Sequence, residues 1–293
     1  MTVKIITHSG SFHADEIFAT ALIKRFYNSN VEVIRTREDS ILSEAVQDPN
    51  IWVVDVGRSY NERRRNFDHH QASFSKKWSK TEIPFSSCGL VWSYLKKKGF
   101  LSKKLSDGEV KIIEDKLIIP IDKHDNRVAT WPQSVMFKLA NRNKNTIEDF
   151  HRALTIAEIH LEDTIYYAKQ TELNIQRIKD VEFIENGLVA VVGEEIHNMI
   201  NPLANNTDAK VVIMPKTKDG DISNITWAIR SLPSEKEGVL APKEWRGLSS
   251  IELQEMSGLK SLDFTHKSGF LTIAKNRKDA EKVARLMLSN GGY

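Results

Sequence analysis

The chain has 293 residues, of which 40% are hydrophobic and 28% are charged, and this is the composition of an ordinary globular protein. Lysine and arginine exceed aspartate and glutamate by 42 − 39 = 3 residues, so the net charge neither requires nor excludes a nucleic-acid partner. The single cysteine, Cys88, cannot form an internal disulfide, and the sequence has neither a secretion signal nor an apolar run long enough to cross a membrane. We therefore expect a cytoplasmic location and no membrane partner.

The first half of the chain alternates strand-like and helix-like segments, a pattern typical of a parallel sheet flanked by helices. Strands are predicted at Val3–Thr7, Val31–Ile34 and Ile51–Gly57, the last being apolar over nearly its whole length, as expected of a strand covered on both faces. Helices are predicted at Asp15–Tyr27, Ser86–Lys98 and Val110–Ile119, the last of which should stop near Pro120. These elements predict a doubly wound α/β domain over residues 1–145.

The second half begins with one long helix. Between Thr146 and Lys179, apolar residues recur every three or four positions without glycine or proline, which predicts a helix that links two domains. Strand-like segments follow at residues 188–192, 209–214, 222–229, 262–265 and 270–274, and helices are predicted from about Ser250 and from Lys278 to Leu288. We therefore predict a smaller α+β domain over residues 180–293.

Residues that can bind metal follow the strands of the first domain. His8 comes after the first strand, Asp55 ends the third, and Asp68-His69-His70 lies shortly beyond. The loop that begins at His8 also contains His13 and Asp15. Because ligands collect beyond the carboxyl ends of parallel strands, we expect these side chains to converge.

Each of these residues also has an ordinary interpretation. His8 or His13 alone could be a surface or core histidine, and Asp15 could be an acid favoured by a helix N-terminus. Asp55 is harder to explain in this way, because a carboxylate that ends an apolar strand is costly to bury without a cation. The combination therefore favours a metal site.

The mixture of imidazole and carboxylate ligands suits a transition metal better than calcium. Manganese is the preferred interpretation, and magnesium and other divalent ions are alternatives. Two such ions about 3.5–4 Å apart can activate water and neutralise the charge that develops on a phosphate. The sequence thus predicts metal-dependent phosphoester hydrolysis.

Three motifs surround the candidate ligands: His8-x-Gly10-x-Phe12-His13-x-Asp15-Glu16, Val54-Asp55-Val56-Gly57 and Asp68-His69-His70-Gln71. Further segments follow in order at residues 86–91, 121–126, 244–248, 257–258 and 266–270. Together they resemble the DHH-type phosphoesterase superfamily and, within it, the melanocyte-proliferating-gene (Myg) exonuclease branch. The resemblance spans nearly the whole chain.

In that superfamily a bridging aspartate serves two metal ions. The resemblance implies that one ion is held by His8, His13 and Asp55, and the other by Asp15, Asp55, His69 and Asp122. It further implies that His70 contacts the scissile phosphate and that Asp68 orients the histidines. Relatives often have aspartate at the position of His13.

The resemblance also implies that the second domain binds the part of the substrate that does not react. The candidate residues there are Arg230, Arg246, His266, Lys267, Ser268 and Gly269. The implied activity is a manganese-dependent 3′–5′ exonuclease acting on RNA or a short oligonucleotide, with the oligomeric state left open.

Two kinds of alternative remain for the activity. One is a small-molecule phosphatase, pyrophosphatase or cyclic-dinucleotide phosphodiesterase of the same superfamily. The other is a non-catalytic nucleic-acid-binding protein, against which the full set of ligands argues. Trp78, Trp131 and Trp227 are candidates for stacking on bases, which would favour a long substrate.

Overall fold

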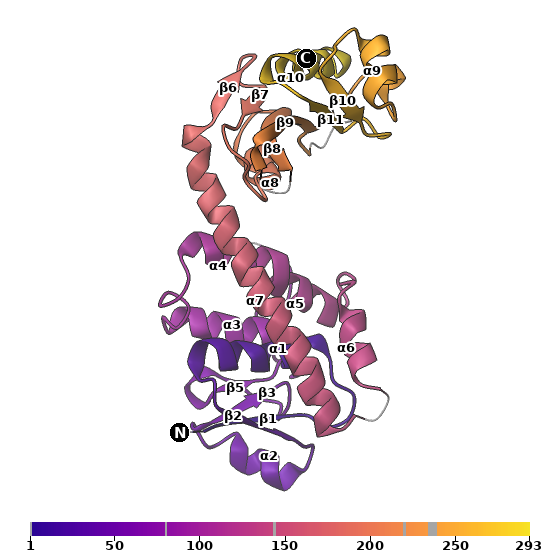
Figure 1. Ribbon diagram of the computed structural model, residues 1–293. Coiled ribbons are helices and arrows are strands. Elements are labelled where there is room, and N and C mark those ends of the chain that lie inside the picture. The colour runs from indigo at the N-terminus through magenta and orange to yellow at the C-terminus, as the bar shows by residue number, and fades with distance from the viewer. Residues whose placement is uncertain (1, 80, 143–144, 219–220, 234–238) are drawn as a thin grey trace. The chain divides into compact units, whose positions relative to one another are not determined.

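The computed structural model describes residues 2–79, 81–142, 145–218, 221–233 and 239–293 (Figure 1). Its N-terminal sheet has five strands in the order β2-β1-β3-β5-β4. The strands are β1 (Val3–Thr7), β2 (Val31–Arg35), β3 (Ile51–Val54), β4 (Tyr60–Asn61) and β5 (Asn66–Phe67). All adjacent pairs are parallel except β4 with β5, which is antiparallel.

Helices cover both faces of this sheet, as Figure 1 shows for α2 on one side and α1 and α3 on the other. The helices are α1 (Ala14–Leu22), α2 (Asp39–Ala45), α3 (Ser87–Lys97), α4 (Asp107–Ile113), α5 (Ile119–Asp125) and α6 (Ser134–Ala140). Trp52 and Val54 belong to the larger core, whereas Val53 packs in the small core beneath α2. This alternation explains why β3 is apolar throughout.

The predicted helix at residues 110–119 is longer than expected, and the prediction that it stops near Pro120 is wrong. Helix α4 begins at Asp107 after Ser106, whose hydroxyl accepts a hydrogen bond from the Glu109 amide at 3.1 Å. It continues through a π-helical turn, Glu114–Ile118, directly into α5. Pro120 follows the π turn by two residues, and this wider turn accommodates a residue that has no backbone N–H.

The C-terminal sheet has six strands in the order β10-β11-β9-β8-β7-β6. The strands are β6 (Glu182–Ile184), β7 (Val189–Val191), β8 (Val211–Lys218), β9 (Asp221–Ser231), β10 (Leu262–Thr265) and β11 (Leu271–Ala274). Among its described strands, only β7 and β8 form a parallel pair. The predicted strands after residue 187 are therefore found as one mainly antiparallel sheet.

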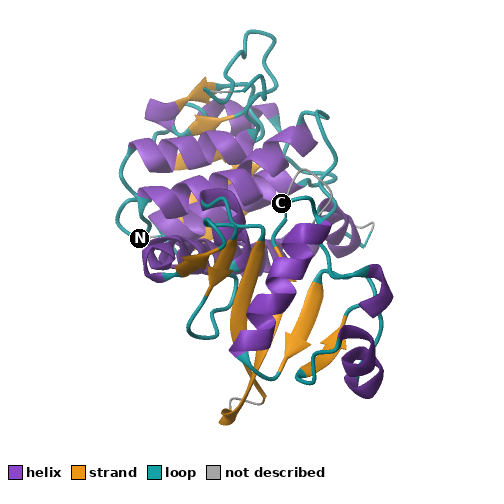
Figure 2. Ribbon diagram, turned by 90° about the horizontal axis from the view of Figure 1, so that it is seen from above, coloured by secondary structure: helices purple, strands orange, loops and turns teal. Residues whose placement is uncertain are grey.

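Helices α8 (Ile200–Asn206), α9 (Ser250–Ser257) and α10 (Arg277–Asn290) accompany this sheet, and Figure 2 shows α10 lying along one face. Val283 and Met287 of α10 pack with Ile213 and Ile229 of the central strands. Leu203 of α8 packs in a separate core with Val212, whose side chain points to the opposite face from Ile213.

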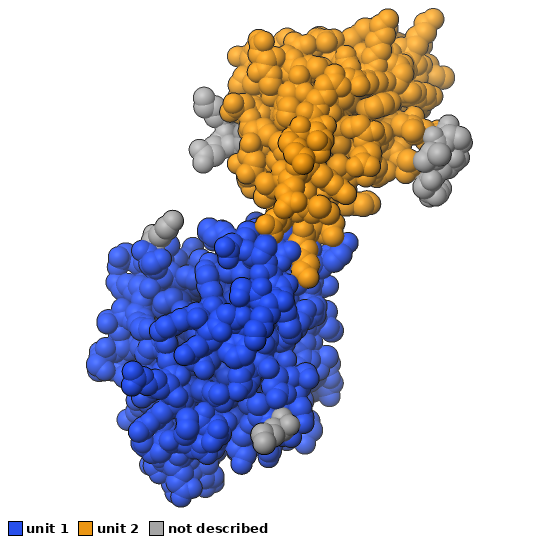
Figure 3. All heavy atoms as spheres, turned by 90° about the vertical axis from the view of Figure 1, so that its left-hand side faces the viewer, with its two compact units in different colours: residues 1–168 blue, residues 169–293 orange. Residues whose placement is uncertain are grey.

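The long helix is α7 (Ile147–Arg177). Its apolar side chains, Phe150, Leu154, Ala157, Leu161 and Ile165, are buried in the larger N-terminal core. The chain forms two compact units, residues 1–168 and 169–293, with the division inside this helix (Figure 3). None of the described helices combines the length and apolarity needed to span a membrane.

Candidate metal centre

The ends of β1 and β3 place His8 and Asp55 at the same edge of the N-terminal sheet. Thr7 pairs with Val54 in the parallel register, so the residue that follows each strand emerges at the same level. Asp55 has φ 58°, in the left-handed region that few residues other than glycine adopt, although aspartate tolerates it better than most. Backbone strain of this kind is typical of functional sites.

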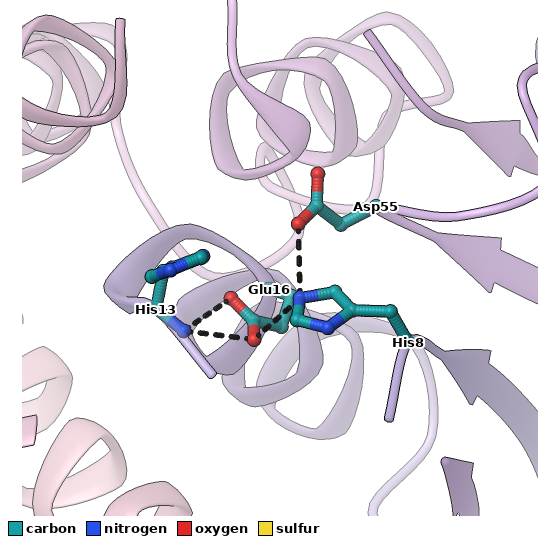
Figure 4. Close-up of side chains that lie close together, drawn as sticks. All are labelled: His8, His13, Glu16 and Asp55. Atoms are coloured by element: carbon teal, nitrogen blue, oxygen red, sulfur yellow. Dashed lines mark hydrogen bonds and ion pairs between the residues drawn. The ribbon is translucent and has the colours of Figure 1, made fainter. Parts of the chain in front are cut away.

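His8 presents an unprotonated ring nitrogen to two carboxylates when it is neutral. Its Nδ1 lies 3.1 Å from the Ser9 carbonyl oxygen, which can only accept, so Nδ1 carries the proton. Nε2 lies 3.1 Å from Glu16 Oε1 and 3.4 Å from Asp55 Oδ2 (Figure 4). In this tautomer the lone pair of Nε2 is available to a metal ion.

The surroundings of His8 favour a positive charge. Burial lowers the pKa of His8, but hydrogen bonds and charge attraction from Asp55 and Glu16 outweigh burial and raise it to about 10. The same carboxylates would attract a metal ion to this point.

Glu16 holds the start of α1 against His13. Its carboxylate oxygens accept hydrogen bonds from the His13 backbone amide at 2.8 and 3.0 Å, and its side chain is fully buried (Figure 4). The ligand atoms of His8, His13, Glu16 and Asp55 lie within 4.8 Å of one another. Glu16 occurs in the first motif, but its position alone did not assign it to the site, since acids are common in the first turn of any helix.

A second group of ligand atoms contains Asp15, Asp125 and His13, again within 4.8 Å of one another. Asp15 is fully buried, and neither of its oxygens has a hydrogen-bond partner in the described part of the chain. Burial raises the pKa of Asp15 well above its usual value, and the negative charges of Asp55, Asp125 and Glu16 raise it further. A buried carboxylate without donors is costly, and a bound cation would remove that cost.

His69 lies between these two groups. Its Nε2 is 3.2 Å from Asp125 Oδ2 and 3.4 Å from Asp55 Oδ1, yet it forms a hydrogen bond of good geometry with no described residue. Burial lowers the pKa of His69, but Asp125 and Asp55 raise it to about 10. His69 Nε2, Asp55 Oδ1 and Asp125 Oδ2 thus lie close together without good hydrogen-bond geometry, which suits coordination of one shared ion.

Asp55 connects the two groups through its two oxygens. Oδ2 faces His8 and Oδ1 faces His69, while the buried Ser87 hydroxyl donates to Oδ1 at 3.0 Å. Burial acts to raise the pKa of Asp55, but His69 and His8 hold it well below its usual value. An ionised carboxylate whose oxygens face different clusters is suited to bridge two ions.

Asp68 fixes the orientation of His70. Its carboxylate accepts hydrogen bonds from the Arg58 amide at 2.7 Å, the His70 amide at 3.0 Å and His70 Nδ1 at 2.8 Å. The His70 side chain is 60% exposed and lines the cavity next to the metal groups. Asp68 therefore holds the His70 ring at the wall of the cavity.

Asp122, expected as a metal ligand, is placed elsewhere. Its Oδ1 accepts from the Ser86 hydroxyl at 2.6 Å and the Gly89 amide at 3.1 Å, and its Oδ2 accepts from Trp78 Nε1 at 2.7 Å. It is fully buried, and the described residues that line the cavity do not include it. Asp125, three residues later, lies in the group with His13 and Asp15, and its Oδ2 is 3.2 Å from His69 Nε2.

Asp122 instead joins α3 to α5. A Cβ atom on Gly89 would lie 2.0 Å from Asp122 Oδ2, so the first turn of α3 can approach this carboxylate only because residue 89 is glycine. Burial raises the pKa of Asp122 to about 7 although Ser86, Trp78 and Gly89 donate to it.

The tryptophans proposed to stack on bases have structural roles. Trp78 donates to Asp122, and Trp131 is buried beside Phe18 and Phe137. Trp227 packs against the core of the second unit. The sequence could not distinguish these residues from exposed aromatics, because tryptophan occurs both in protein cores and at binding surfaces.

The metal groups open into a cavity of about 1330 Å³ within the first unit. Its lining includes His8, His13, Asp15, Asp55, His69 and Asp125, but neither Asp122 nor Glu16, which is fully buried next to His8. Arg37, Arg58, Arg127 and Lys138 also line it. The cavity thus combines metal-binding side chains with cations suited to an anionic ligand.

The candidate substrate residues of the second unit form a separate cluster around Phe270. The Arg230 guanidinium lies 5.5 Å from the Phe270 ring centroid, and the His266 ring lies 4.5 Å from it. His266 Nδ1 accepts from the Ser268 amide at 3.1 Å, which leaves Nε2 as the donor of the neutral ring.

Arg246 completes this cluster. Its Nε donates to the Ala241 carbonyl at 2.9 Å, and it packs so closely on Gly269 that a Cβ there would lie 2.6 Å from this nitrogen. Lys267 and Ser268 are exposed beside it. The structure thus brings all six candidates together within the second unit.

Comparison with known proteins agrees with the sequence motifs. The family model MYG1_exonuc, described as an uncharacterised protein family (UPF0160), matches residues 4–288. The MYG1 exonuclease of Mus musculus is 25% identical over 329 residues, covering 98% of this chain and 85% of that protein. The MYG1 protein of Chlamydia pneumoniae is 27% identical over 314 residues, which cover 98% of this chain and 97% of that protein.

Among solved structures, RecJ from Thermus thermophilus in complex with Mn2+ is 13% identical with a TM-score of 0.27. The match covers 99% of this chain but only 52% of the RecJ chain, and at that TM-score the likeness carries no weight for the fold or the site. The family match over residues 4–288 is decisive by itself, and it shows that this chain belongs to the MYG1 exonuclease family.

Proposed function

We propose that this chain is a phosphodiester hydrolase that depends on two divalent ions, preferably manganese, and that it acts as a 3′–5′ exonuclease on RNA or short oligonucleotides. The observation that carries the proposal is Asp15, a fully buried carboxylate without a hydrogen-bond donor among the described residues and surrounded by Asp55, Asp125 and Glu16. A bound cation would let this carboxylate stay ionised, whereas burial and its acidic neighbours otherwise favour the protonated form.

The residues present fit two ions. His8, His13 and Asp55 would hold one, with Glu16 beside them, and Asp15, Asp55, Asp125 and His69 would hold the other. The mixed nitrogen and oxygen donors suit manganese, whereas magnesium prefers oxygen alone. Asp125 replaces Asp122 in the set that the sequence predicted.

When bound, the two ions would supply an activated water and neutralise charge on the phosphate. The chain's own residues would do the positioning. Asp68 holds the His70 ring through Nδ1, so the opposite nitrogen, Nε2, is free to meet a phosphate oxygen. Ser87 and the two histidines hold Asp55 in its ionised form.

The relatives support a nuclease, because proteins similar over nearly the whole chain are named MYG1 exonuclease. Preference for RNA and the 3′–5′ direction rest on the motifs that resemble the superfamily. Catalytic action is favoured over binding alone because both metal groups converge on one cavity that also contains His70.

The test is elemental analysis of the purified protein combined with a hydrolysis screen. Labelled RNA, DNA, dinucleotides and pyrophosphate are each incubated with and without chelator, and manganese, magnesium and zinc are then added back. Up to two ions per chain, loss of activity in chelator and best recovery with manganese are expected, with RNA shortened from its 3′ end. Absence of metal together with unchanged hydrolysis in chelator would overturn the proposal, and preference for pyrophosphate would identify a small-molecule phosphatase.

A further inference from the structure

We propose that the cavity contains a second phosphate subsite, formed by Arg58, Arg127 and Lys138, that binds a phosphate next to the scissile one. This inference rests on the proposed function and narrows its substrate class to chains with at least two phosphates. The three side chains line the same cavity as the metal groups and are exposed to solvent.

The three cations are available to a ligand. Among the described residues, no carboxylate lies within 4.0 Å of any of their charged nitrogens. Elsewhere on the surface, cations such as Lys97 and Arg277 are paired with glutamates. Unpaired cations that line one cavity favour the binding of an anion there.

The two arginines are tied to the metal-binding segments by strained backbone. Arg58 has φ 46° and follows Asp55 by three residues, and its amide donates to Asp68 at 2.7 Å. Arg127 has φ 57° and follows Asp125 by two residues, with its amide donating to the His124 carbonyl at 3.1 Å. Both arginines therefore lie within three residues of a candidate metal ligand, at the rim of the same cavity.

The net charge of the cavity also favours a phosphate subsite. The carboxylates of the cavity lining are Asp15, Asp39, Asp55, Asp68 and Asp125, and with the buried Glu16 they contribute −6. The four cations of the lining, Arg37, Arg58, Arg127 and Lys138, contribute +4. Two divalent ions would add +4, so the loaded cavity has a net charge of +2 without counting its histidines.

A net positive cavity attracts a polyanion more strongly than a single phosphate. The ions and His70 serve the phosphate that is cleaved, whereas the cations lie on loops and a helix that are not part of the ligand groups. Arg37 is the exception, because its Nε donates to the Ser9 carbonyl at 3.0 Å and so holds the His8 loop. For this reason Arg37 is left out of the subsite.

The experiment compares two substrates that differ in phosphate number. Bis(p-nitrophenyl) phosphate has one phosphate, and the 5′-phosphorylated dinucleotide pApA has two. The variants are Arg58→Gln, Arg127→Gln and Lys138→Gln, which remove charge but keep a long polar side chain. Arg142→Gln is the matched control, because Arg142 is also exposed with φ 47° but does not line the cavity.

Each subsite variant should lower kcat/KM for pApA by about ten- to a hundredfold, mainly through KM, because one charge-assisted contact is lost. Hydrolysis of bis(p-nitrophenyl) phosphate, metal content and Tm should stay at the parent level, as should every property of Arg142→Gln. Equal losses on both esters, or no loss on either, would overturn the subsite.

Binding of a phosphorothioate analogue of pApA in manganese, measured by calorimetry, separates the subsite from the proposed function. If the parent protein cleaves neither ester in manganese, the proposed hydrolysis fails. The subsite would still be supported by weaker binding of the analogue to the three variants, and it would be overturned by unchanged binding.

Discussion

Replacing Asp15 by asparagine should change stability in opposite directions with and without metal. In chelator the wild-type side chain is a fully buried carboxylate that has no donor among the described residues and faces Asp55, Asp125 and Glu16. Asparagine is neutral without the cost of raising a pKa, and it supplies an N–H that can donate to those carboxylates. The free energy of unfolding should therefore rise by about 1–3 kcal/mol.

In manganese the wild-type protein should be more stable than Asp15→Asn. The wild-type protein gains about 2.7 kcal/mol for each ion present at a hundred times its Kd, and the variant loses a ligand of one ion. For a unit of 168 residues, each 1 kcal/mol corresponds to a shift in Tm of about 2–4 °C. Calorimetric scans in chelator and in manganese should consequently cross, with the variant melting higher only in chelator.

Asp68→Asn is the matched control, because Asp68 is equally buried but accepts hydrogen bonds from the Arg58 amide, the His70 amide and the His70 ring. Its replacement puts an amide donor opposite existing donors and should lower Tm in both conditions. If Asp15→Asn lowered Tm in chelator as Asp68→Asn does, the carboxylate would be a structural group and the reasoning about a cation would be refuted.

Three further predictions concern the bridge, the position of the last ligand and the second unit. Asp55→Asn should abolish hydrolysis and weaken both ion sites while the far-ultraviolet spectrum stays native, and retained activity would show that Asp55 only ends a strand. Asp125→Asn should reduce metal content at nearly unchanged Tm in chelator. Asp122→Ala should lower the free energy of unfolding by about 2–4 kcal/mol, because three donors lose their acceptor. Metal loss in Asp122→Ala and intact metal content in Asp125→Asn would restore Asp122 as the ligand. His266→Ala and Arg230→Ala should leave metal content intact and lower kcat/KM on RNA by about one to two decades while sparing bis(p-nitrophenyl) phosphate, and equal losses on both substrates would place these residues in the fold or the catalytic centre.

Much of the fold could be predicted from periodicity. Strand β1 was predicted within its observed bounds, and the predicted long helix is α7, because both follow a strong hydrophobic pattern. Short elements such as β4, β5 and α2 were missed, because two to seven residues are too few to show the hydrophobic period of a strand or of a helix. Propensity also failed at Pro120, because the π turn before it allows the helix to continue.

The site was predicted as far as strand ends could indicate it. His8 and Asp55 follow paired parallel strands, so their proximity is a direct result of topology. The choice between Asp122 and Asp125 could not be made in this way, because both lie on α5 and only the packing of that helix decides which carboxylate faces the cavity. Ser87 and Glu16 were not assigned for a similar reason, since their partners are distant in sequence or common to many helices.

The π turn at Glu114–Ile118 makes the centre depend on backbone geometry as well as on side chains. A π turn holds one residue more than an α turn, so it sets the rotational phase of α5 relative to α4. If the same residues closed into a regular α turn, α5 would rotate by about 100°. Asp125 would then turn away from Asp15 and His69, although every ligand would still be present in the sequence. A chain with one residue fewer in this turn would instead keep α5 in phase, because the π turn absorbs that residue.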